Sequence, residues 1–151
     1  MRSRSRRALL RVAASLAVGI VFARVATAAE KKLSRAQWLA IRKVISDQLA
    51  ALRAGDAETA FGYASPGIRA QFGNAATFMA MVRETYSALI EARYTEFLEG
   101  AVIDGVIVQP LRLIAPDNSV QVALYTVEKQ AARGGWRITG CQIAPSTVQA
   151  A

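Results

Sequence analysis

The chain has 151 residues, of which 53% are hydrophobic, and a formal net charge of +8. This length supports one domain with a core of its own, and the hydrophobic fraction excludes general disorder. The charge alone would favour nucleic acid or an anionic membrane as a partner. However, six of the 19 basic residues precede Ala28 in a stretch without acids, and the 13 that follow are scattered among 11 acids. We therefore expect no nucleic-acid partner.

Residues 1–28 have the layout of a cleavable signal peptide. Their start is rich in arginine, residues 12–23 are uncharged and largely apolar, and Ala26 and Ala28 form a small-x-small cleavage site. The apolar segment is shorter than the ~20 residues that cross a bilayer as a helix, although a retained single-pass anchor stays the alternative. We expect a periplasmic or secreted protein that meets the membrane only during export.

Arg6 and Arg7 point to a particular export route. The stretch Ser5–Arg11 resembles the twin-arginine motif, in which two arginines precede a spacer, two apolar residues and a basic residue. Such a signal would carry the protein across the inner membrane already folded. Arginine pairs also occur in ordinary basic leaders, so the twin-arginine and general secretory routes both stay open.

After a charged lead-in at residues 29–33, the apolar spacing predicts three main helices. Ser34, Asp56 and Asn74 are candidate N-caps, because their side chains can accept from free backbone amides in a first turn. The first helix has an apolar face and ends at a glycine, the second is short, and the third continues to Leu89. Between the second and third, a serine followed by a proline favours a brief helical turn.

From Tyr94 the apolar period changes to alternation, which predicts four strands separated by turn signals. The expected strands are 94–102, 106–114, 120–125 and 134–143. In the third, Val120, Val122 and Leu124 alternate with Gln121, Ala123 and Tyr125 to give a half-buried strand.

This order of elements predicts an α+β domain over residues 34–146, followed by a frayed tail at 147–151. We expect three helices packed on one face of a curved, four-stranded antiparallel sheet, in a cone-like arrangement. A single cysteine excludes an intramolecular disulfide, so stability has to come from the core.

The closing strand concentrates unusual residues. Trp136 and Ile138 are expected to seal one face of the sheet, and Gly140 to permit a bulge or a close backbone approach. Cys141 is interpreted as a small buried hydrophobe rather than as a reactive thiol. The strand therefore indicates architecture more than chemistry.

Several short strings, in order and spacing, resemble the family catalogued as domain of unknown function 4864. They are 54–56, 60–61, 64–66, 78–82 with Tyr86, 125–130 and 136–141. The resemblance covers roughly residues 41–143, and the turn at 131–133 departs from it by being longer and more basic. It implies a bacterial, exported or membrane-linked protein with the cone fold of the nuclear transport factor 2-like superfamily, and it implies no activity.

The residue types present limit the chemistry. Without histidine, Ser-His-Asp and Cys-His arrangements and histidine-ligated metals are excluded, and no glycine-rich phosphate loop occurs, so we expect no cofactor and no metal. Acid–base catalysis by a carboxylate and a tyrosine remains. The candidate acids are Asp47, Asp56, Asp104 and Glu128. Structural roles are the alternative for three of them: helix cap for Asp56, turn residue for Asp104 and cross-strand partner for Glu128.

Tyr63, Tyr86, Tyr125 and Arg137 are the candidate ligand-binding residues, because each combines an apolar body with a hydrogen-bond donor. The leading hypothesis is a non-enzymatic periplasmic module that binds a small apolar molecule or a protein partner. The alternative is a cofactor-free lyase or isomerase that uses a buried carboxylate and a tyrosine. A third reading is a structural homodimer that packs sheet against sheet.

Overall fold

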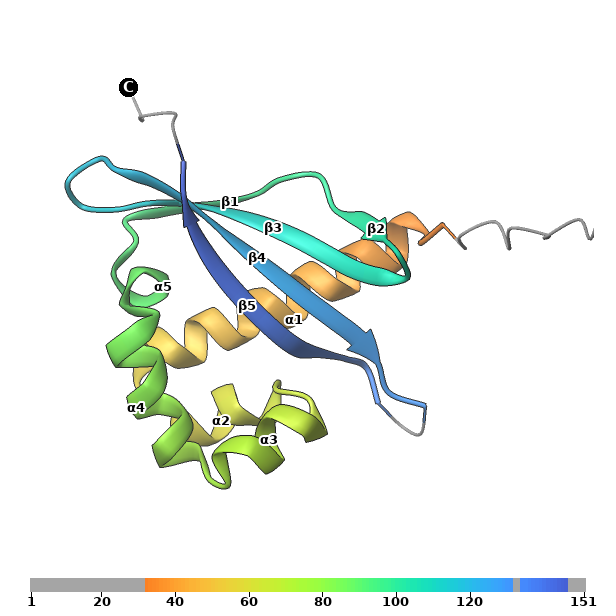
Figure 1. Ribbon diagram of the computed structural model, residues 1–151, viewed down its shortest axis with the longest axis horizontal. Coiled ribbons are helices and arrows are strands. Elements are labelled where there is room, and N and C mark those ends of the chain that lie inside the picture. The colour runs from red at the N-terminus through yellow and green to blue at the C-terminus, as the bar shows by residue number, and fades with distance from the viewer. Residues whose placement is uncertain (1–31, 132–133, 147–151) are drawn as a thin grey trace, which may run out of the picture.

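Helices come first and strands second in the computed structural model, which describes residues 32–131 and 134–146 (Figure 1). This order confirms the predicted α+β fold. The described helices are α1 (Arg35–Ala54), α2 (Ala57–Gly62), α3 (Pro66–Phe72), α4 (Ala75–Thr85) and α5 (Ser87–Glu91). The described strands are β1 (Tyr94–Phe97), β2 (Ala101–Ile103), β3 (Val106–Ile114), β4 (Val120–Lys129) and β5 (Trp136–Pro145).

Predictions about the two ends of the chain lie outside the described residues. They concern the signal peptide at 1–28, the export residues Arg6 and Arg7, the cleavage residues Ala26 and Ala28, the start of the lead-in, and the tail at 147–151. Among the helices that the structure does describe, none combines the length and the apolar character needed to cross a membrane.

The predicted N-caps are confirmed and explain where the helices begin. Ser34 forms a capping box: its Oγ accepts from the backbone N–H of Gln37 at 3.2 Å, and its own N–H donates to Gln37 Oε1 at 2.8 Å. Asp56, Ser65 and Asn74 accept from backbone amides in the first turns of α2, α3 and α4.

The third predicted helix is interrupted. It was expected to continue to Leu89, but Tyr86 leaves helical geometry at φ −122° and ψ 31° and separates α4 from α5. A tertiary contact accounts for the break, because Tyr86 Oη donates to the carbonyl of Cys141 in β5 at 3.0 Å. The end of α1 follows the prediction, since Gly55 closes it in the left-handed region at φ 71°.

The sheet is antiparallel and has the order β1-β3-β4-β5, with β2 also paired to β3. The strand predicted at 94–102 is therefore two strands, and the described sheet has five strands instead of four. Gly100, between them, packs under the ring of Trp38, where a Cβ would lie 2.3 Å from a ring carbon. Next to this interruption, Gln109 Nε2 donates to the carbonyl of Leu98 at 2.8 Å. A side-chain amide thus takes the place of a backbone N–H donor for this carbonyl.

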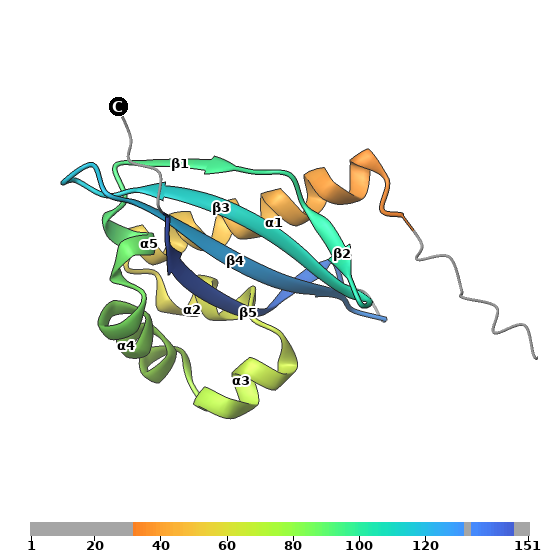
Figure 2. The ribbon, with the colours of Figure 1, turned by 45° about the horizontal axis from the view of Figure 1, so that its top comes forward.

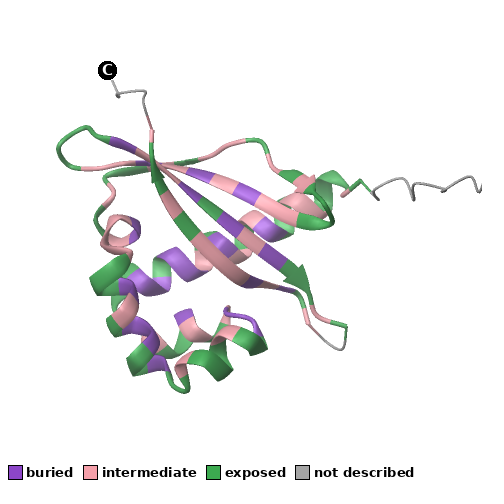
Figure 3. Ribbon diagram, viewed as in Figure 1, coloured by how far each residue is buried: buried purple, intermediate pink, exposed green. Residues whose placement is uncertain are grey.

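The described helices lie on one face of the twisted sheet (Figure 2). Buried and less buried residues alternate along its strands (Figure 3), and on β4 the buried set contains Ala123, Tyr125 and Val127. Leu124 is 36% exposed. Of the predicted set Val120, Val122 and Leu124, only Val120 is buried, and the regular alternation from Ala123 onward places Leu124 on the opposite face from Tyr125.

The predicted bulge is present on β5. Thr126 pairs with Gly140 while the next residue of β4, Val127, pairs with Ile138, so Thr139 is the extra residue. The close approach expected at Gly140 is also there, because a Cβ would lie 3.0 Å from Thr126 Oγ1. The bulge bends β5 where it passes the small helices.

The same point of β5 holds the connection between α2 and α3. The backbone N–H of Ser65 donates to the carbonyl of Ile138 at 2.8 Å, and the N–H of Ile138 donates to the carbonyl of Tyr63 at 2.9 Å. These two bonds form a single parallel bridge between Ala64 and Ile138. The helical layer is therefore attached to the sheet directly beside the bulge.

The buried side chains form two clusters. The first lies between α1 and the sheet and includes Ile45, Trp136 and Ile138, which confirms that the last two seal the covered face. The second joins the end of α1 to α2 and α4, and its centre is Phe78, whose ring lies 5.4 Å from that of Phe61. Leu52 belongs to this second cluster, so α1 contributes to both.

Candidate functional site

A cavity of about 220 Å³ lies where the two clusters meet. The first cluster contributes Leu89, Tyr125 and Ile138 to its wall, and the second contributes Leu52, Phe78 and Val82. The remaining lining residues come from α1, the α2–α3 segment, α4 and the bulged part of β5, and they are Gln48, Ala64, Ile68, Gln71, Phe72, Met81, Tyr86, Thr139, Gly140 and Cys141.

Helix α3 forms the outer wall of this cavity. It has no buried residue, and its half-buried Ile68 and Phe72 and exposed Gln71 all line the cavity. The helix has 7 residues and is held at its start by the Ser65 cap and by the bridge to Ile138. Gln71 is the exposed residue among those that line the cavity, so the cavity meets solvent at α3.

Tyr125 is the most enclosed polar residue of the site. Its side chain lines the cavity, the residue is 1% exposed, and its hydroxyl has no hydrogen-bond partner among the described residues. Burial raises the pKa of Tyr125 well above its usual range, because the phenolate would lose its hydration. At neutral pH the hydroxyl is thus protonated, and its electrostatic neighbour is the side chain of Cys141.

Cys141 lies directly across from Tyr125 in the β4–β5 ladder and also lines the cavity. Burial raises the pKa of the Cys141 thiol to about 12, against an opposing, smaller effect of the Tyr125 hydroxyl. A protonated thiol is a poor nucleophile, so this geometry agrees with the interpretation of Cys141 as a small hydrophobe.

The four predicted ligand contacts separate into two groups. Tyr86 and Tyr125 both line the cavity, whereas Tyr63 and Arg137 are not part of its wall. Tyr86 donates to the carbonyl of Cys141, and the buried Tyr125 hydroxyl interacts with the side chain of the same residue. Arg137 donates to the carbonyl of its neighbour Trp136 at 2.9 Å.

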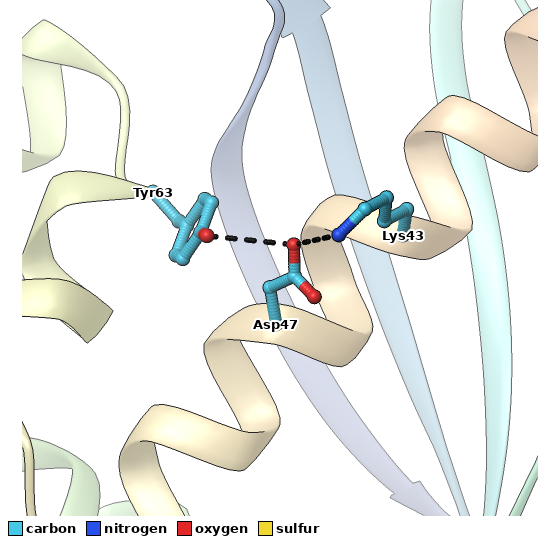
Figure 4. Close-up of polar contacts among 3 residues, drawn as sticks. All are labelled: Lys43, Asp47 and Tyr63. Carbon is cyan, nitrogen blue, oxygen red and sulfur yellow. Dashed lines mark hydrogen bonds and ion pairs between the residues drawn. The ribbon is translucent and has the colours of Figure 1, made fainter.

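Tyr63, at the end of α2, instead reaches toward Lys43 and Asp47 on α1 (Figure 4). Asp47 Oδ2 lies 2.6 Å from Lys43 Nζ and accepts from Tyr63 Oη at 3.4 Å. The side chains of Lys43 and Asp47 are 73% and 36% exposed, so the ion pair is a helix-surface pair between residues four apart. The carboxylate of Asp47 is in contact with a tyrosine, but outside the cavity.

The other three candidate acids have structural roles. Asp56 caps α2, and the hydrogen bonds from Thr59 lower its pKa, which is the opposite of what a general base at neutral pH needs. Asp104 occupies the β2–β3 turn with φ 50°. Glu128 faces Arg137 across the ladder and accepts from Gln130 Nε2 at 2.9 Å.

The wall of the cavity carries no formal charge within the described residues, since Asp, Glu, Lys and Arg are all missing from it. In the described part of the chain, no group of three or more His, Cys, Asp or Glu side chains is arranged to hold a metal ion. The arrangement is chemically suited to enclose an apolar molecule and to offer it one hydrogen bond.

Sequence reasoning missed the contribution of α1 and α3 to this wall. Gln48 was the detectable signal, because it lies between Ile45 and Leu52 on the apolar face of α1. It is 4% exposed, lines the cavity, and donates from Nε2 to the carbonyl of Ala60 at 3.2 Å. A polar residue within an apolar stripe can mark the place where a helix passes a cavity.

The family described as Domain of unknown function (DUF4864) matches residues 34–151, which is most of the chain. The chain belongs to this family. The DUF4864 match confirms the resemblance found in the sequence, and the matched range contains every residue that lines the cavity. None of the curated proteins compared with this DUF4864 chain matches it.

Proposed function

We propose that this DUF4864 domain is a non-enzymatic module that binds a small apolar molecule in the cavity, after export to the periplasm or the cell exterior. The cavity itself carries the proposal: it is about 220 Å³ in volume and its wall is mostly aliphatic and aromatic. An apolar cavity of roughly 150 Å³ in an engineered protein binds benzene, so this one is large enough for a single-ring molecule.

The distribution of charge favours binding over catalysis. A lyase or isomerase of the kind considered above needs a carboxylate beside the reacting atom, and Asp47, the only candidate acid near a tyrosine, lies outside the cavity. Of the two tyrosines on the wall, Tyr86 donates to the carbonyl of Cys141 and Tyr125 faces Cys141 across the ladder, and no described lining residue is an acid. These observations support a binding module.

A substitution at the mouth tests the proposal. We expect benzene, titrated into the whole chain, to cause saturable NMR shifts of amides in α4 and β5. Ile68→Trp should abolish these shifts, because the half-buried Ile68 lines the cavity and an indole would fill it. Ala70→Trp is the matched control, since Ala70 lies on the same helix, is exposed and is not part of the wall.

The control should bind benzene within about twofold of the unmodified chain, because a surface substitution usually changes little. Shifts that persist in Ile68→Trp, or that fail to appear in the unmodified chain, would contradict a ligand site in this cavity.

The export part of the proposal has a separate test. We expect the full chain to appear in the periplasmic fraction with its mass shortened by residues 1–28, and a version without residues 2–28 to stay in the cytoplasm, because that segment has the layout of a signal peptide. Replacing Arg6 and Arg7 with lysines decides the route: lost export indicates the twin-arginine pathway. A full chain that keeps its complete mass in the membrane fraction would support an uncleaved anchor instead.

A further inference from the structure

We propose that the molecule held in this cavity is uncharged and carries one hydrogen-bond donor, such as a hydroxyl group, that donates to Gln48 Oε1 from an otherwise apolar body. This inference rests on the proposed function, and it specifies the chemical class of the ligand. It starts from the position of Gln48, a polar residue on the apolar face of α1 that is 4% exposed and lines the cavity.

One half of the Gln48 amide is occupied. Its Nε2 donates to the carbonyl of Ala60 at 3.2 Å, and because a carbonyl only accepts, the NH₂ group is the half that faces α2. The backbone N–H of Tyr63 donates to the same carbonyl at 3.3 Å. The carbonyl of Ala60 therefore has a donor without Gln48, and satisfying it does not by itself explain a glutamine at this position.

The other half of the amide, Gln48 Oε1, accepts no hydrogen bond from the described residues. Apart from the Tyr125 hydroxyl, which interacts with Cys141, the fully enclosed side-chain oxygen and nitrogen atoms of the described residues are all paired. The unpaired Gln48 Oε1 is therefore not fully enclosed. Since Gln48 is 4% exposed and lines the cavity, the space that its Oε1 meets is the cavity. Polar atoms removed from bulk water are mostly paired, so this oxygen is suited to accept from a bound molecule.

The other polar side chains in the interior of the wall already have partners. Tyr86 Oη donates to the carbonyl of Cys141, and Thr139 Oγ1 donates to a threonine hydroxyl of β4 at 2.8 Å. The Tyr125 hydroxyl is enclosed and interacts with the Cys141 side chain. Gln48 Oε1 is therefore the point at which a ligand gains a hydrogen bond, and because this atom only accepts, the ligand has to donate.

The rest of the wall selects a neutral and compact ligand. Asp, Glu, Lys and Arg are missing from the described wall, so a carboxylate or an ammonium group would lose its hydration here without gaining an opposite charge. Gln71, the remaining polar side chain, is exposed and stays hydrated. Scaling from benzene in a cavity of about 150 Å³, the volume suits roughly nine non-hydrogen atoms. A single ring that bears a hydroxyl group meets these requirements.

Three probes of similar shape test the inference. Phenol and toluene carry a hydroxyl and a methyl group at the same place on the ring, and anisole has an ether oxygen without a proton to donate. Dissociation constants are measured by NMR titration with the unmodified chain and with Gln48→Met, which keeps the length of the side chain and removes the amide. Each probe is compared with itself across the two proteins, which cancels its own affinity for water.

We expect Gln48→Met to weaken phenol binding about three- to tenfold. Toluene and anisole should stay within about twofold or bind more tightly, because neither donates to Oε1. Gln142→Met is the matched control: the same exchange on β5, where Gln142 is exposed and outside the wall, should keep all three constants within about twofold. An unchanged phenol constant in Gln48→Met overturns the inference, and so does an equal loss for the three probes, which would indicate altered shape.

A measurement on the unmodified chain covers the case in which Gln48→Met does not fold. Phenol should shift the NMR resonance of the Gln48 side-chain carbonyl carbon, and toluene should leave it in place, because a hydrogen bond polarises the carbonyl. Equal shifts with the two probes overturn the inference while leaving a cavity that binds apolar molecules. If neither probe binds the unmodified chain, the proposed function fails as well.

Discussion

Replacing Leu111 with alanine is expected to lower the free energy of unfolding by about 2–5 kcal/mol. Leu111 is 1% exposed and lies in the middle of β3, where it pairs with Phe97 of β1 and Ala123 of β4. It belongs to the cluster between α1 and the sheet. The truncation removes apolar contacts and leaves a space that the two flanking strands prevent from closing, so the transfer and cavity costs add.

Leu124→Ala is the matched control for this prediction. Leu124 is the same residue type on the neighbouring strand, but it is 36% exposed and faces away from the helices. Its truncation should cost less than about 1 kcal/mol. Guanidinium unfolding followed by tryptophan fluorescence measures both variants. Equal losses at the two positions would show that the open face of the sheet is buried in solution, for example against a second copy of the chain.

The second large effect is expected at Gln109, which is fully buried in β3. Its Oε1 accepts from Arg42 Nε at 3.1 Å, and its Nε2 donates to the carbonyls of Leu98 and Pro110 at 2.8 and 2.9 Å. The amide therefore fills the interruption between β1 and β2 with hydrogen bonds. Gln109→Leu should destabilise the chain by about 1–3 kcal/mol, because Arg42 Nε loses its acceptor. The carbonyls of Leu98 and Pro110 each lose one of their two donors.

Gln142→Leu on β5 is the corresponding control, because Gln142 is exposed and the same change there should stay within about 0.5 kcal/mol. Hydrogen exchange adds a local measurement. The amide of Leu98, which donates to the carbonyl of Pro110 at 3.1 Å, should lose protection in Gln109→Leu more than amides in the centre of β4 do. If Gln109→Leu leaves the free energy of unfolding unchanged, the polar groups between β1 and β2 are satisfied without the Gln109 side chain.

Local features of the fold were predictable because they depend on neighbours in the sequence. Ser34, Asp56 and Asn74 begin helices as expected, since a cap binds an amide only two or three residues away. Gly140 accompanies a bulge as expected, because glycine tolerates the close approach of the facing strand. The α+β order follows in the same way from the change in apolar period after α5.

The candidate site was only half predictable. Tyr86 and Tyr125 were identified as polar aromatic residues and do line the cavity. Tyr63 satisfied the same criterion but contacts Asp47 on the surface, because a residue type does not say which side of a helix will meet the sheet. The short helix α3 was expected only as a brief turn, and its place as the outer wall of the cavity depends on the bridge between Ala64 and Ile138.

The amino-acid order alone thus settles which segments become helices and strands and where most of them begin. It does not settle which face of β4 is buried, because alternation is symmetrical until a helix covers one side, and here Tyr125 is covered while Leu124 is not. Nor does it reveal that Tyr125 would be buried beside a cavity. That cavity is lined by residues of α1, α4 and β5, which lie far apart in the chain and meet only in the folded protein.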